Sequence, residues 1–212
     1  MKNHRLLDAC SKGKFQEAKD LLSKKRSTPY QNLNAQDDLG NTPLMFCCYH
    51  GSLEMVKLLL QEEQIDVNIG NKFEHTAFLI ACSEAKIELV QVLILHKALD
   101  VNKYDCNKVS PLMIASFYGM LEVVKWILAS RHEINITMRD NDEKTALDFA
   151  QKFDEGISED LKTKKQKIAK LLEEFESDPI ETKLILRKEI NLACNYFFIL
   201  LSLSSVFLNF IN

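Results

Sequence analysis

The residues of this chain that could carry catalytic or metal chemistry are few and scattered. The sequence has six cysteines and five histidines, with no C-x-x-C pair and no Cys/His pair at zinc-site spacing. It also lacks a glycine-rich phosphate loop, a serine nucleophile elbow, an H-E-x-x-H motif and a calcium-binding loop. These absences predict that the protein is not an enzyme and uses no metal ion or cofactor.

Charge and composition narrow the class of partner. The 212 residues include 27 basic and 30 acidic side chains, for a net charge of −3, so no nucleic-acid surface is expected. The N-terminus lacks the apolar run of a secretory signal, so we expect a cytoplasmic location, with a nuclear one left open. A run of lysines alternating with acids predicts a solvated helix face: Lys162, Lys164, Lys165, Lys167 and Lys170.

The elements that must position any site come from a repeated segment. Its copies begin at Thr42, Thr76, Ser110 and Thr145, so successive starts lie 34, 34 and 35 residues apart. Thr or Ser there is a good helix N-cap, and the proline that follows two of them suits the first helical position. A later stretch with apolar residues at helical spacing predicts a second helix. Each unit must stack on its neighbours to bury its apolar face.

These residues resemble the ankyrin repeat, and the segment DDLGNTPLMFCCYHGSLEMVKLLL, which begins at Asp37, matches that pattern closely. The resemblance implies an all-α ankyrin-repeat solenoid of about five stacked helix-turn-helix units with a C-terminal helical extension. We place an N-terminal capping repeat at 1–33 and further repeats at 34–68, 69–102, 103–136 and 137–176.

Departures from the pattern bear on how regular the repeats are. The turn glycine is present as Gly40 but is replaced by Glu74, Lys108 and Glu143 in later copies, so those turns are expected to be strained or differently shaped. The second copy also has Ala85 where two others have a helix-ending glycine. We therefore expect the second copy to be the least regular.

The resemblance also implies where a partner binds. In ankyrin repeats, partner contacts come from the turn tips and from the end of the first helix, on the concave face. Seven of the corresponding residues are apolar or aromatic, which predicts a partly apolar groove that grips a peptide or a helix. The alternative is that these side chains pack between repeats as core. The candidate partner-binding residues are Leu39, Asn41, Tyr49, His50, Lys72, Phe73, His75, Glu84, Asn107, Val109, Phe117, Tyr118, Lys144 and Phe153.

The C-terminal segment contains two further stretches. Asp178-Pro179 breaks the preceding helix, and residues 177–189 predict an amphipathic helix. Residues 190–212 carry no charged side chain and are long enough to span a bilayer. A narrow stripe of Asn and Ser suits a helix docked as a cap on the array as well as a membrane helix, so both alternatives stand.

Together these patterns predict a non-catalytic adaptor or scaffold that binds other proteins on its concave face. One alternative is an adaptor tethered to a membrane through residues 190–212. Another is a regulatory subunit of an enzyme complex. Rigid stacked helices would hold the binding surface ready, so that little ordering entropy opposes binding.

Overall fold

The computed structural model describes residues 4–23 and 32–190, which form helices and connecting loops without a β-strand. A further helix covers residues 179–190. The labelled helices are α1 (Arg5–Ser11), α2 (Phe15–Ser23), α3 (Pro43–Tyr49), α4 (Leu53–Leu60), α5 (Ala77–Ser83), α6 (Ile87–Ile94), α7 (Pro111–Phe117), α8 (Leu121–Ala129), α9 (Ala146–Gln151) and α10 (Glu159–Ser177).

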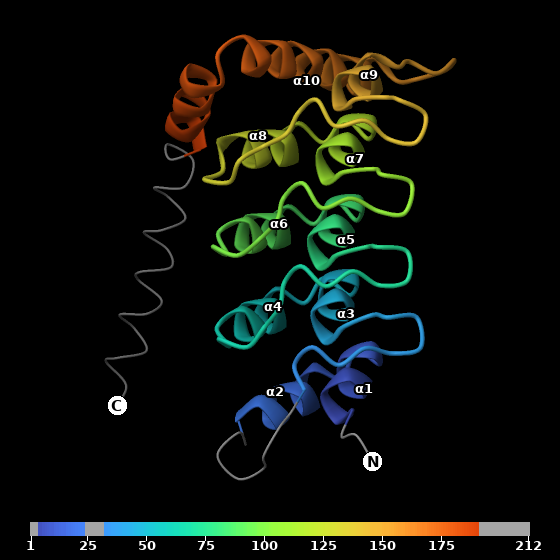
Figure 1. Cartoon of the computed structure of the whole chain (residues 1–212), viewed down its shortest axis with the longest axis vertical. Helices are drawn as coiled ribbons and strands as arrows, with labels where there is room; N and C mark the ends of the chain where they lie inside the picture. The colour runs from blue at the N-terminus through green and yellow to red at the C-terminus, as the bar shows by residue number, and fades with distance from the viewer. Residues whose placement is uncertain (1–3, 24–31, 191–212) are drawn as a thin grey trace.

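The helices stack in two columns (Figure 1). The inner helices α1, α3, α5, α7 and α9 pack each on the next, and the outer helices α4, α6, α8 and α10 do the same. The loop before each of α3, α5, α7 and α9, called a hairpin below, projects beside the inner column. Helix α10 crosses the end of the array. The all-α ankyrin solenoid predicted from the sequence is therefore confirmed.

Side-chain caps begin the inner helices of the four full repeats. Thr42, Thr76, Ser110 and Thr145 each accept a hydrogen bond from the backbone N–H three residues later, at 3.1 to 3.3 Å. Such caps satisfy amide groups that a helix start leaves without a partner, and each contributes about 1 kcal/mol. The regular spacing of these residues in the sequence thus fixes where α3, α5, α7 and α9 begin.

Small side chains let the inner helices approach closely. Cys10, Cys48, Cys82 and Ser116 occupy one offset in successive copies, and all four are fully buried. The thiols of Cys10 and Cys47 lie 3.7 Å apart. Burial raises the pKa of the Cys48 thiol, and burial together with Cys48 raises that of Cys82. Within the described residues, the Ser116 hydroxyl has no hydrogen-bond partner, so this row favours small volume over polarity.

An Asp or Asn side chain organises each hairpin tip. The Oδ1 atoms of Asp37, Asn71, Asp105 and Asp140 each accept two backbone N–H groups, those two and four residues later, at 2.7 to 3.0 Å. The tips thereby keep one shape although their other residues differ.

The turns that lack glycine are strained rather than differently shaped. Gly40 has φ 85°, and Glu74, Lys108 and Glu143 have φ 60°, 60° and 61° in the same left-handed region. A side chain with Cβ costs about 1 kcal/mol there. In the second copy, α5 and α6 have the same lengths as α3 and α4, and Glu74 and Ala85 adopt the left-handed backbone that Gly40 and Gly51 adopt in the first copy. The second copy therefore departs from the pattern in residue type and not in backbone shape.

Part of the lysine run does not form the solvated face expected of it. Lys165 is 3% exposed, because α10 lies across the end of α9. Its Nζ donates to the carbonyl of Lys152 at 2.6 Å and lies 5.3 Å from the centre of the Phe117 ring. Burial lowers the pKa of Lys165. The prediction of a solvated face is therefore wrong for this residue.

The helix over 179–190 overlaps the amphipathic stretch expected at 177–189, beginning two residues later and reaching one residue further, and it packs on α8. Asp178 starts it by accepting the amides of Ile180 and Glu181 at 3.1 and 2.9 Å. Arg187 then donates to the carbonyls of Ala129 and Ser130 at the C-terminal end of α8, at 2.8 and 3.0 Å. A cation at those carbonyls also complements the helix dipole.

The apolar stretch at 190–212 lies, apart from its first residue, outside the described residues. Among the helices of residues 4–23 and 32–190, none has the length and hydropathy needed to cross a bilayer.

The left-handed turns give a prediction about stability. Glu143→Gly is expected to raise the free energy of unfolding by about 0.5–1 kcal/mol, because glycine adopts this backbone without a Cβ clash. Gly40→Ala is the matched control and should lower the same free energy, since its Cβ would come within 3.0 Å of the Asn71 Cα. Urea unfolding measures both, and a less stable Glu143→Gly variant would contradict the strain at this turn.

Asp37 gives a prediction about acid. Burial raises its pKa, but hydrogen bonds from Asn41 and from backbone amides outweigh burial, so the net shift is downward. The resulting stabilisation is present above the unfolded pKa of about 3.9 and is lost as pH falls through the lower folded value.

We expect Asp37→Asn to fold, since Asn71 makes the same turn with a neutral amide. The variant should lose less stability than the natural chain between pH 7 and pH 3, as measured by urea unfolding at both values. Asp38→Asn is the neighbouring control. Identical losses in the Asp37→Asn variant and the natural chain would show that this carboxylate does not contribute.

Candidate partner-binding face

The hairpin tips and the inner helices form one continuous surface, called the inner face below. Backbone hydrogen bonds join consecutive tips, from Lys72 N–H to Leu39 C=O at 2.9 Å and from Cys106 N–H to Phe73 C=O at 3.0 Å. Asn141 N–H makes the equivalent bond to Asn107 C=O at 3.0 Å. The tips are thus held in fixed register, and side chains at equivalent positions form a row.

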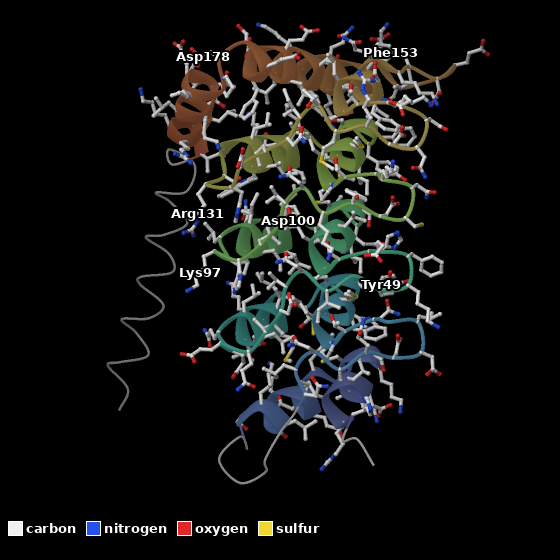
Figure 2. The ribbon with its side chains drawn as sticks, in the orientation of Figure 1. Tyr49, Lys97, Asp100, Arg131, Phe153 and Asp178 are labelled. Carbon is white, nitrogen blue, oxygen red and sulfur yellow. The ribbon has the colours of Figure 1, made fainter. Side chains whose placement is uncertain are left out.

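Five of the apolar residues expected to contact a partner are exposed. Leu39 and Phe73 lie at hairpin tips. Tyr49 is the last residue of α3, and Tyr118 and Phe153 follow the ends of α7 and α9. Their exposed fractions run from 42% to 61%. In Figure 2, Tyr49 and Phe153 lie on the hairpin side of the array. These exposures argue against the alternative that these five side chains pack as core.

Two of the predicted apolar residues pack inward. Phe117 is half-buried and meets Tyr118 and Phe149 edge to face, with ring centres 5.0 and 5.8 Å apart. Val109 is half-buried against the hydrophobic core. For these two residues the packing alternative describes the structure better than an open groove does.

Two of the predicted polar residues are held by neighbouring parts of the array. Asn41 accepts a hydrogen bond from the side chain of Asn71 at 2.8 Å and donates one to Asp37 at 3.1 Å, so it joins two hairpins. The His50 ring lies 5.8 Å from that of Phe15 and 5.6 Å from that of Tyr49. Both side chains therefore also stabilise the array.

The remaining polar residues differ in how freely they face solvent. His75 lies 3.9 Å from a carboxylate oxygen of Asp105 and 6.0 Å from the Phe73 ring centre. Lys144 pairs with Asp142 at 3.4 Å. The other three, Lys72, Glu84 and Asn107, are exposed.

A further row of apolar side chains on the inner helices was not predicted from the sequence. Four residues after each N-cap comes a half-buried apolar side chain, and these are Phe46, Ile80, Ile114 and Phe149. The signal was present as a shared offset with an apolar residue in every full copy. This row makes the inner face apolar between the tips and the helix ends.

The inner face shows no sign of metal chemistry within residues 4–23 and 32–190, where no three His, Cys, Asp or Glu side chains are placed to hold an ion. What the arrangement offers is exposed aromatic and aliphatic side chains flanked by polar ones. Such surfaces suit association with another protein, because aromatic side chains bury much apolar area while losing few rotatable bonds.

Comparison with known proteins agrees with this architecture. A family model described as ankyrin repeats in three copies matches residues 6–105 and 62–140. The crystal structure of EF0377, an ankyrin repeat protein, is 27% identical, with a TM-score of 0.68. The match covers 81% of this chain and 80% of that chain. Ankyrin repeats are in general protein-binding modules, and this chain belongs to the ankyrin repeat family.

Proposed function

We propose that the protein is a non-catalytic adaptor or scaffold of the cytoplasm that binds another protein on its inner face. The observation that supports this most directly is the set of exposed apolar residues Leu39, Tyr49, Phe73 and Phe153 on one side of a rigid array. Isolated apolar residues are normal on protein surfaces, but several on one face favour an interaction site.

The partner chemistry follows from what lies around these side chains. The half-buried row of Phe46, Ile80 and Phe149 would be covered by apolar groups of a peptide or helix. Exposed Lys72 and Glu84 lie in the repeat at 69–102 and would fix the orientation of the bound peptide or helix by charge. Because consecutive tips are already hydrogen-bonded, the face loses little conformational entropy on binding.

Two variants of this proposal keep the same binding face. A membrane-tethered adaptor would have residues 190–212 in a bilayer, and a regulatory subunit would bind an enzyme. An enzyme whose rate changes on binding would identify the second variant. The face itself is tested in the same way for all three.

The test is a triple substitution of Tyr49, Phe73 and Phe153 by Ala, with Tyr118 left intact because it also borders a hollow under α10. Partners captured by the natural chain serve as the probe. An anchor residue at an interface contributes about 2 kcal/mol, or about thirtyfold in affinity, so the triple variant should lose its captured partners.

Leu95→Ala is the matched control, since Leu95 is 53% exposed but follows the outer helix α6. Circular dichroism and thermal unfolding should show both variants folded. Capture of the same proteins by the triple variant would contradict binding on the inner face.

A further inference from the structure

A second surface with apolar side chains adjoins the inner face at Tyr118, where α10 crosses the turn between α7 and α8. A hollow of about 620 Å³ opens there, with Ile87, Tyr118 and Leu161 among its lining. A neighbouring hollow of about 290 Å³ lies between α8, α10 and the helix over 179–190, with Leu171 and Ile185 in its lining. Leu121 and Lys167 line both hollows, which together we call the trough.

Most of the charged side chains on the rim of the trough are paired with one another. Lys164 pairs with Asp160 at 2.6 Å, and Lys170 pairs with Glu174 at 3.5 Å. A third lysine lies between acids of two elements, since the Lys125 Nζ is 3.5 Å from both Glu122 and Glu189. An occupant with its own charges would have to break such pairs. The trough therefore fits an apolar segment without charged side chains.

The described chain ends beside the trough and leads toward it. Along the helix over 179–190, Lys183 contacts the carbonyl of His132, Arg187 contacts those of Ala129 and Ser130, and Glu189 reaches Lys125. Successive residues thus approach progressively earlier positions, from His132 back to Lys125 within α8, whose first residue is Leu121. Ile185 and Glu189 already line the trough, and Ile190 packs against the core.

We propose that residues 191–212 fold back into the trough and cover Leu121, Leu171 and Ile185. This segment follows the described chain directly and carries no charged side chain. Its 22 residues would extend about 33 Å as a helix, which exceeds the length of α8. The tail would then be an intramolecular cap on the last repeats, and this role is independent of what binds the inner face.

The experiment uses the full chain in detergent-free buffer and digests it with chymotrypsin, which cleaves after aromatic residues such as Phe197 and Phe198 in the tail. Ile185→Glu and Ile87→Glu place a charge in the trough from two different elements. Ile180→Glu is the matched control, since Ile180 is on the same helix as Ile185, is 77% exposed and lies outside both hollows.

The expected result is slow cleavage of the tail in the natural chain and in Ile180→Glu, and at least fivefold faster cleavage in Ile185→Glu and Ile87→Glu. Hydrogen exchange should rise at residues 118–123 and 160–167 in the two trough variants alone, with thermal unfolding as the check that each is folded.

Two outcomes would overturn the proposal. One is cleavage of the natural tail as fast as that of the trough variants. The other is flotation of the full chain with phosphatidylcholine vesicles, with the tail protected only when vesicles are present, which would place the segment in a membrane.

Discussion

The burial of each helix pair against the next is the constraint on which the rest of this structure depends. A pair such as α5 and α6 covers its apolar side chains only by contact with the pairs before and after it. The row of Cys10, Cys48, Cys82 and Ser116 shows how strict this contact is, because a larger side chain at that offset would separate the inner helices. The apolar side chains at an end of such an array must be covered in another way. At the C-terminal end, α10 and the helix over 179–190 cover them.

Stacking also explains why some residues adopt a backbone conformation that their side chains disfavour. Glu74, Lys108 and Glu143 have little preference for left-handed backbone, yet they adopt the conformation that Gly40 adopts readily. The tip carbonyl and amide of each turn must meet those of the next turn, so a turn of another shape would lose these hydrogen bonds. The strain at one residue is thus outweighed by contacts on both sides of it.

Features set by neighbouring residues could be predicted from the sequence, whereas features set by distant helices could not. The N-caps at Thr42, Thr76, Ser110 and Thr145 could be predicted because a cap depends on residues within one turn of helix. The exposure of Leu39 and Phe73 followed from their place at the tips. The burial of Lys165 and Phe117 could not be predicted, because it depends on the path of α10 across α7 and α9. The half-buried row that includes Phe46 and Ile80 has a signal in the sequence, an apolar residue four positions after each N-cap, but its partial burial depends on how the inner helices stack.

The reactivity of the buried thiols reports which part of the array opens. Only the thiolate of cysteine reacts readily with alkylating reagents, and burial of Cys48 and Cys82 suppresses that form as well as excluding the reagent. Among the cysteines that the structure describes, Cys106 is exposed and the others are buried. Alkylation of Cys10 would therefore follow separation of the first repeat from the second, whereas alkylation of Cys82 would require the middle of the stack to part. The relative rates at these sites would show whether the solenoid unravels from its ends or opens as a whole.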